Sequence, residues 1–233
     1  SGCLAYSTLD GNLVVNPIEL EGRELSLYQS FSLAPLEWIR TLEQIAEHLQ
    51  IELTVLMADH EAYGAALRLP TALLILLAED VTIVAMVRRG RIEWAGSVPS
   101  GADSVLAQAT KDLDVSSHQL STFMRLFRAG DLDRAVGHRV SKQFWLALKE
   151  WMGTIAEEIG AHAATSLPHH VYIWDRTRRL PEALPALQTP YWENQLPFER
   201  CPAVEELSIE QVSSVLDCTT RATGWEHLLL RSL

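Results

Sequence analysis

An adjacent pair of acidic residues, Glu79 and Asp80, is the first feature of this sequence that could do chemistry. Two carboxyl groups held close together in different environments form the acid/base pairs of many hydrolases. Neighbouring residues of an extended strand, however, point to opposite faces, and acidic residues are common in the turns that join strands. The pair therefore favours a turn between two strands over a catalytic site.

Histidine, cysteine and serine residues give no standard site either. His169 and His170 could bind a metal ion through their imidazoles, but no second His or Cys pair lies at ligand spacing. The three cysteines are far apart, and Cys201 precedes a proline, which makes it a poor candidate nucleophile. No Gly-x-Ser-x-Gly, Gly-x-Gly-x-x-Gly or Gly-x-x-x-x-Gly-Lys-Ser/Thr pattern occurs. We expect no catalytic residue, no metal site and no cofactor.

The composition indicates a folded protein of a reducing compartment. The chain has 233 residues, 48% of them hydrophobic, and its cysteines lack the spacing of a disulfide framework. Its formal charge of −11 opposes binding to nucleic acid, and the basic cluster Arg176, Arg178 and Arg179 is interpreted as a solvated loop. The longest apolar run, residues 72–78, is far shorter than the roughly 20 residues of a membrane helix. We expect a cytoplasmic location without direct membrane insertion.

The amino-terminal quarter of the chain predicts a small subdomain, residues 1–57. Short β-type stretches at residues 13–15 and 24–33 indicate a hairpin, with Asn16-Pro17 and Glu21-Gly22 as turn residues. Pro35 starts an amphipathic helix over residues 36–49. The apolar side of this helix is expected to pack on a sheet. A further strand is predicted over residues 52–57.

The remainder, residues 58–233, predicts a larger α/β lobe. A short helix over 58–67 precedes three strands in a meander, at 71–78, 81–87 and 91–98. Further elements are then predicted as follows: helices over 101–113, 117–129 and 141–162, a buried strand over 170–174, an irregular stretch with five prolines over 181–202, and closing helices over 208–216 and 220–230.

The order of these elements, together with several local matches, resembles the actin-like cell-division protein FtsA and, more distantly, its pilus-assembly relative PilM. Residues 9–11 and 16–17, with Gly22 and Leu25, are similar to the entry into the small 1C subdomain of FtsA. Residues 73–90 resemble a strand, phosphate loop and strand, and residues 171–184 resemble the adenosine-loop region. The resemblance implies an α/β (α+β) fold with an actin-like, ribonuclease H-like sheet and flanking helices, plus a ββαβ subdomain of the 1C (SHS2) type.

The departures from this family bear on nucleotide binding. Its phosphate loop needs glycines, so that backbone amides can approach phosphate, and an aspartate to organise magnesium. The corresponding positions here are Leu76, Leu77, Ala78, Glu79, Asp80 and Val81. The adenosine-loop Thr-Gly-Gly is replaced by Trp174, Asp175 and Arg176. A chain that starts at the 1C-like segment would also lack the amino-terminal 1A strands with the first phosphate loop. Both motifs are degenerate, and the chain is expected to bind no nucleotide.

The resulting hypothesis is a non-catalytic scaffold or adaptor similar to FtsA, acting through protein partners in bacterial cell division or envelope assembly. Residues 225–233 are too short and too weakly basic for a membrane anchor, so contact with the inner membrane would pass through a partner. Three alternatives stay open: an actin-like ATPase whose first phosphate loop precedes this chain, a PilM-like pilus-assembly adaptor, and an unrelated α+β adaptor. Association of the chain with further copies of itself is another expected kind of protein contact.

Large aromatic residues supply the candidate interaction sites. The seven tryptophans exceed what one small core usually requires, so some are expected on the surface. In the proline-rich stretch 181–202, the prolines restrict the backbone, while Tyr191, Trp192 and Phe198 offer large apolar area. These three are the predicted partner-binding residues, with Trp192 as the exposed anchor.

Overall fold

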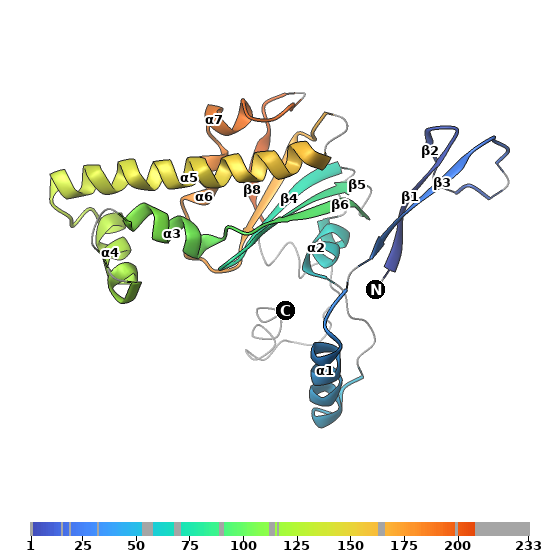
Figure 1. The fold of residues 1–233 in the computed structure, drawn as a ribbon, viewed down its shortest axis with the longest axis horizontal. Coiled ribbons are helices and arrows are strands. Elements are labelled where there is room, and N and C mark those ends of the chain that lie inside the picture. The colour runs from blue at the N-terminus through green and yellow to red at the C-terminus, as the bar shows by residue number, and fades with distance from the viewer. Residues whose placement is uncertain are drawn as a thin grey trace.

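The computed structural model describes residues 2–14, 16–18, 20–31, 33–52, 58–67, 71–88, 91–111, 115, 117–162, 166–198 and 200–207. A large lobe is built on a five-stranded sheet, and a small three-stranded sheet and one helix extend from it (Figure 1). None of the helices described is both long and apolar enough to cross a bilayer.

The large sheet has the strand order β6-β5-β4-β7-β8. Strands β4 (Thr71–Leu77), β5 (Thr82–Arg88) and β6 (Arg91–Val98) form the predicted antiparallel meander. Strand β7 (His170–Asp175), also predicted, pairs in parallel with the other side of β4. Strand β8 (Ala203–Glu206), which was not predicted, pairs in parallel with β7. The sheet is therefore antiparallel on one side of β4 and parallel on the other.

Strand β4 is central because its side chains are apolar on both faces. Leu73, Ile75 and Leu77 join the larger hydrophobic cluster, whereas Leu74 and Leu76 belong to a smaller cluster on the opposite face. All five are buried. A continuous apolar run without polar alternation is what a strand covered on both faces requires.

Three helices cover the larger cluster. They are α3 (Ala102–Thr110), α4 (Ser117–Ala129) and α5 (Arg134–His162). The first two confirm the predicted helices. The third begins seven residues before the predicted start, because Asp133 accepts a hydrogen bond from the Ala135 amide through its side chain (2.9 Å) and so caps the helix. Gly130, with φ of +75°, separates α4 from α5.

Helix α2 (Asp59–Leu67), at the predicted position, lies on the opposite face of the sheet. Tyr63 from this helix packs against the smaller cluster, which contains Ile92 of β6. Gly64 lies so close to Ile92 that a Cβ atom there would overlap its side chain. The sheet is therefore covered on both faces.

The amino-terminal sheet differs from the prediction. Strands β1 (Gly2–Leu9), β2 (Asn12–Val14) and β3 (Leu25–Phe31) lie in the order β2-β1-β3, all antiparallel. The predicted hairpin between residues 13–15 and 24–33 is therefore wrong, because both segments pair with β1. Asp10 and Gly11, with φ of 50° and 79°, form a two-residue turn that joins β1 to β2.

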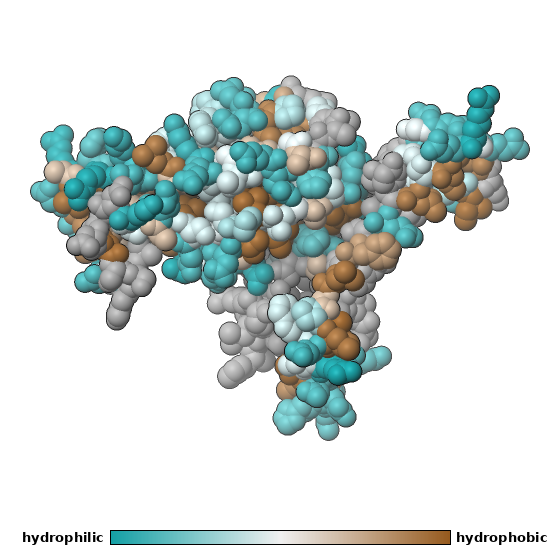
Figure 2. All heavy atoms as spheres, in the orientation of Figure 1, coloured by the Kyte–Doolittle hydropathy of each residue, from teal (hydrophilic) through white to brown (hydrophobic). Residues whose placement is uncertain are grey.

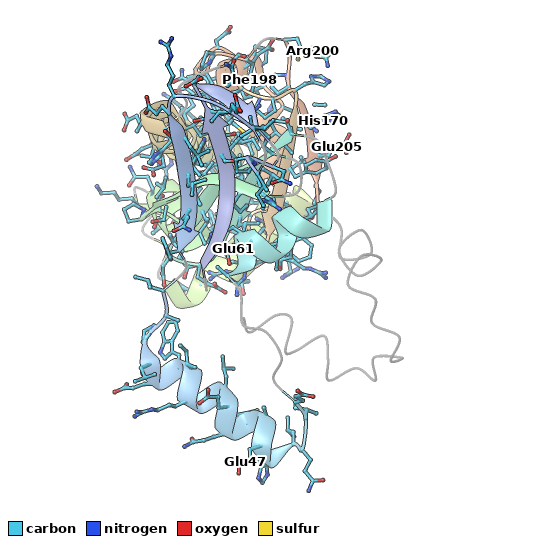
Figure 3. The ribbon with its side chains drawn as sticks, turned by 90° about the vertical axis from the view of Figure 1, so that its right-hand side faces the viewer. Glu47, Glu61, His170, Phe198, Arg200 and Glu205 are labelled. Atoms are coloured by element: carbon cyan, nitrogen blue, oxygen red, sulfur yellow. The ribbon has the colours of Figure 1, made fainter. Side chains whose placement is uncertain are left out.

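Helix α1 (Leu36–His48) begins after Pro35, as predicted, but the sheet that was expected to cover it does not. Trp38 is 68% exposed, and Figures 1 and 3 show α1, which carries Glu47, extending away from both sheets. The predicted strand 52–57 and the predicted helices 208–216 and 220–230 lie outside the described residues, wholly or nearly so. The division of the chain at residue 57 stays a prediction.

Candidate functional site

The fold brings the two predicted loops together at one edge of the large sheet. Strands β4 and β7 run in parallel, with Leu76 opposite Trp174 and Leu77 opposite Asp175. The Arg176 amide donates a hydrogen bond to the Leu77 carbonyl oxygen at 3.0 Å. Because parallel strands end at the same edge, the segment after β4 and the segment after β7 are neighbours. This edge is where ligands of open α/β sheets usually bind.

The segment after β4 is a tight turn into β5, as the acidic pair predicted. The Ala78 amide donates to the Val81 carbonyl oxygen at 2.9 Å and closes the turn. Glu79 and Asp80 are exposed at its tip, whereas Leu76 is buried in the smaller hydrophobic cluster. Leu76 therefore supplies no oxygen ligand for a metal ion at the edge.

The amino-terminal end of α3 is occupied by this same turn. The amides of Ala102 and Asp103 donate to the carbonyl oxygens of Ala78 and Glu79, each at 2.9 Å. Gly101 permits the approach, since a Cβ atom there would overlap the Glu79 carbonyl. Helix amino termini bind phosphate through such amides, but here the chain's own carbonyls take them. Gly101 was not singled out from the sequence; its place as the first residue of the helix predicted over 101–113 was the available signal.

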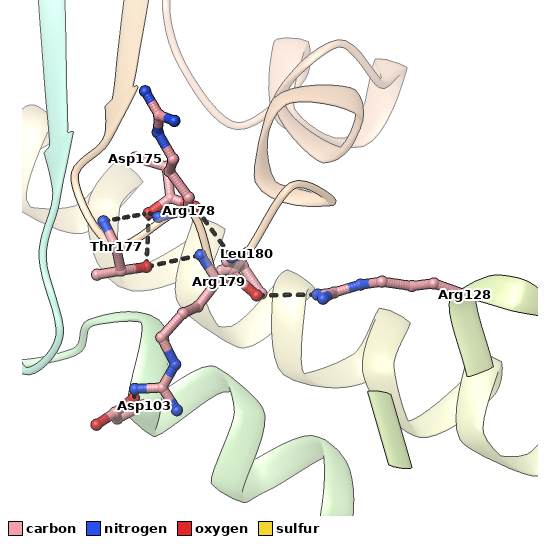
Figure 4. Close-up of polar contacts among 7 residues, drawn as sticks. All are labelled: Asp103, Arg128, Asp175, Thr177, Arg178, Arg179 and Leu180. Atoms are coloured by element: carbon pink, nitrogen blue, oxygen red, sulfur yellow. Dashed lines mark hydrogen bonds and ion pairs between the residues drawn. The ribbon is translucent and has the colours of Figure 1, made fainter. Parts of the chain in front are cut away.

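The segment after β7 is held by the Asp175 carboxylate (Figure 4). Its Oδ1 atom accepts hydrogen bonds from the Thr177 amide (3.0 Å), the Thr177 hydroxyl (2.7 Å) and the Arg178 amide (3.0 Å). Its Oδ2 atom accepts one from the Leu180 amide (2.9 Å). Arg178 has a positive φ of 54° within this loop. The carboxylate thus organises its own loop.

Arginine side chains tie this loop to the neighbouring helices. Arg179 forms an ion pair with Asp103 of α3. Arg128 of α4 donates to both Glu182 carboxylate oxygens (2.6 and 2.9 Å) and to the Arg179 carbonyl oxygen (2.9 Å). The basic cluster was interpreted as a solvated loop, but its third member, Arg179, has this structural role. Arg128 was missed, because nothing local in its sequence indicates its distant partners.

A pocket of ≈ 280 Å³ lies beside the Asp175 loop. Leu180, Pro181 and Leu184 supply apolar wall, and Arg178 and Glu206 supply opposite charges. An apolar pocket with mixed charges suits a side chain of a peptide better than a triphosphate, which requires converging positive groups.

Replacing Asp175 by alanine is expected to lower the free energy of unfolding by about 1–3 kcal/mol. Four hydrogen-bond donors of the loop would lose the carboxylate that accepts their bonds. Chemical denaturation measures this change. Asp131, exposed between α4 and α5, is the matched control, and Asp131→Ala should stay within about 0.5 kcal/mol of the parent. Equal effects of the two variants would show that the carboxylate does not hold the loop.

The predicted aromatic anchors have different positions from those expected. The proline-rich stretch contains two short helices, α6 (Ala183–Leu187) and α7 (Pro190–Glu193), rather than irregular chain. Trp192 on α7 is 0% exposed and packs near Phe198, with ring centroids 6.3 Å apart. The expectation of an exposed Trp192 is therefore wrong: Pro190 starts a helical turn that directs this indole into the core.

The other two aromatics, Tyr191 and Phe198, are half-buried, and their role in binding a partner stays a prediction. Tyr191 contacts Trp145 of α5 edge to face, at 6.4 Å between ring centroids. The Lys149 ammonium lies 4.8 Å from the Tyr191 ring centroid and 5.5 Å from that of Trp145. These contacts hold α7 on α5 by aromatic and cation–π attraction.

The environments of the other cysteine, tyrosine and histidine groups can be given for the described residues. Partial desolvation and the negative charge of Glu193 raise the pKa of the Cys201 thiol, which disfavours the nucleophilic thiolate. Burial and the charge of Glu205 raise the pKa of Tyr172. His169 and His170 stack edge to face, with centroids 5.1 Å apart. Within the described ranges, no three His, Cys, Asp or Glu side chains are grouped to hold a metal ion.

No protein-family model matches the sequence, and no curated protein matches it significantly. Solved structures do resemble the fold. The ethanolamine utilization protein EutJ from Carboxydothermus hydrogenoformans has a TM-score of 0.52 at 14% identity, over 74% of this chain and 57% of its own. A PilM–PilN type IV pilus biogenesis complex gives 0.53 at 12% identity, over 86% and 60%.

The AMPPNP-bound MreB5 of Spiroplasma citri gives a TM-score of 0.50 at 12% identity, over 86% of this chain and 68% of its own. The chain therefore spans about 57–60% of the length of the first two structures. At these identities the likeness concerns the arrangement of strands and helices alone. The chain has a mixed α/β, actin-like (ribonuclease H-like) fold, with a five-stranded mixed sheet flanked by helices.

Proposed function

We propose that this chain is a non-catalytic, actin-like scaffold that acts through protein–protein contacts. The observation that carries the proposal is the occupied amino-terminal end of α3, where Ala78 and Glu79 carbonyl oxygens already accept the Ala102 and Asp103 amides. Phosphate at this end would have to displace both hydrogen bonds. It would also approach a turn that contains no glycine.

Electrostatics at the same edge also oppose a nucleotide. Glu79 and Asp80 are exposed at the β4–β5 turn, and their charges would repel a polyphosphate. A bound magnesium ion needs carboxylate oxygens, and those of Asp175 accept four hydrogen bonds from their own loop. Magnesium binding at Asp175 would therefore compete with the contacts that shape the loop.

Two observations support a protein as the partner: a solved structure with the same fold, and the charge of this chain. PilM, which shares the fold, was solved in a complex with PilN of type IV pilus biogenesis. By analogy, this chain would recruit a protein of envelope assembly or, as the resemblance to FtsA suggests, of bacterial cell division. It would contact the inner membrane through that partner. The formal charge of −11 opposes nucleic acid as the partner.

The competing function is that of an actin-like ATPase. It is favoured by one observation: the segments after β4 and β7 meet at the edge where actin-like folds hold nucleotide, and the MreB5 structure with this fold contains AMPPNP. Under this function, the β4–β5 turn would open to release the α3 amides.

Calorimetric titration with magnesium and ATP or ADP, up to millimolar concentration, separates the two functions. We expect no saturable heat, while MreB5 titrated in parallel shows that the assay detects binding. Micromolar affinity would contradict the scaffold proposal. In that case a Glu79→Gln/Asp80→Asn variant should bind more tightly if nucleotide lies at this turn, because two repelling charges are removed.

A further inference from the structure

Exposed apolar side chains concentrate in one part of the chain. Of the twelve large hydrophobic residues that are exposed in the described structure, eleven lie within residues 18–51, and the other is Leu146. Figure 2 shows brown, apolar side chains over the small sheet and near α1. Exposed apolar surface concentrated in this way marks an interaction site. This surface is remote from the β4–β7 edge.

Two distinct faces make up most of this surface. On β3, Leu25, Leu27 and Phe31 alternate with other residues and so lie on one face of the small sheet. We call this the sheet face. Residues 38 and 45 of α1 and the C-cap residue 49 (Trp, Ile and Leu) lie on one side of the helix by their spacing of seven and four; we call this the helix face.

The connection between the two faces keeps them apart within one chain. Strand β3 ends at Phe31 and α1 begins at Leu36, so four residues join them. Four residues span at most about 14 Å. Pro35, with φ of −55° and ψ of 134°, is extended, and its ring restricts the backbone at the start of the helix. In the structure α1 extends away from both sheets, so its apolar side is open to a second copy (Figures 1 and 3). Short hinge segments of this kind are found where elements are exchanged between copies.

We propose that two copies of this chain exchange their α1 helices, so that the helix face of each copy packs on the sheet face of the other. Each chain carries both complementary surfaces, so one two-fold arrangement covers all four faces. A buried aliphatic side chain removes roughly 100 Å² of apolar surface from water and an aromatic one 150–250 Å². The six side chains of the two faces supply the apolar centre of such an interface. Together with the five others exposed within residues 18–51, they offer on the order of the 800 Å² that each partner of a stable interface buries.

Light scattering coupled to size exclusion tests this arrangement on the complete chain. The parent should be a dimer at micromolar concentration. Trp38→Glu on the helix face and Leu27→Lys on the sheet face should each raise the dissociation constant at least a hundredfold. Leu146→Glu, which alters a 48% exposed side chain on α5, is the matched control and should leave the dimer unchanged. Circular dichroism melting confirms that each variant is folded.

Mixing the two defective variants distinguishes exchange from other forms of pairing. In an exchanged dimer, the Leu27→Lys chain still offers an intact helix face and the Trp38→Glu chain an intact sheet face. The mixture should therefore regain dimers that neither variant forms alone. A monomeric parent would overturn the proposal and indicate that another protein, or the same chain, covers both faces. A mixture that stays monomeric would also overturn it. A Leu27→Lys variant that stays dimeric by itself would overturn it as well and would indicate helix-to-helix pairing. These outcomes are independent of whether nucleotide binds.

Discussion

Replacing Trp192 by alanine is expected to lower the free energy of unfolding by about 3–5 kcal/mol. Trp192 is among the largest fully buried side chains, and its removal leaves a cavity between α7 and the core. Phe198 would lose its aromatic neighbour. Chemical denaturation followed by circular dichroism measures the change, and at this size the variant can be unfolded at growth temperature.

Two further variants make this expectation specific. Within the described atoms, the buried Trp192 indole nitrogen has no hydrogen-bond partner, so Trp192→Phe keeps most apolar area without breaking a bond and should cost less than about 1.5 kcal/mol. Leu146→Ala, at an exposed position of α5, should change stability by about 0.5 kcal/mol or less. If Trp192→Ala were as mild as Leu146→Ala, the residue would not be part of the core.

Replacing Gly101 by alanine is expected to lower the free energy of unfolding by about 1–3 kcal/mol, the usual cost of overpacking. The new methyl group would overlap the carbonyls of Ala78 and Glu79, and backbone atoms cannot move aside as a flexible side chain does. The backbone of Gly101 itself, with φ of −117°, accepts any residue, so the loss would come from this contact alone. Thermal or denaturant unfolding reports it.

Gly153, inside α5, is the matched control for this substitution. A Cβ atom there meets nothing within 4 Å. Alanine should therefore stabilise the helix by about 0.5–1 kcal/mol through its better helix propensity. The two glycine-to-alanine changes are expected to have opposite signs. A gain at both positions would mean that α3 does not lie against the β4–β5 turn.

The elements of the large lobe could be predicted where hydrophobic periodicity was strong. The meander β4 to β6, strand β7 and helices α3 and α4 follow from apolar runs and helical spacing. Strand β8 has four residues, which is too short for a periodic signal. Strand β1 was missed although Asp10-Gly11 is a strong hairpin signal, because those residues were interpreted as part of a different motif.

The candidate site was predictable in position but not in detail. Parallel pairing of β4 and β7 brings the two predicted loops together, as the actin-like resemblance implied. The contacts that fill the site depend on tertiary structure: the α3 amides meet carbonyls of a separate turn, and Arg128 reaches Glu182 across 54 positions of sequence. The predicted exposure of Trp192 was wrong for a related reason. A proline-rich sequence does not reveal which side of a short helix packs against the core.

The short, acidic strand β8 has a consequence for how copies of the protein can meet. It forms one end of the large sheet among the described strands, and Glu205 and Glu206 are both exposed on it. A second β8 placed alongside would bring four carboxylates together over four residues of backbone pairing. Like-charge repulsion then outweighs the few hydrogen bonds gained, which protects this edge from the open-ended strand stacking that leads to fibrils.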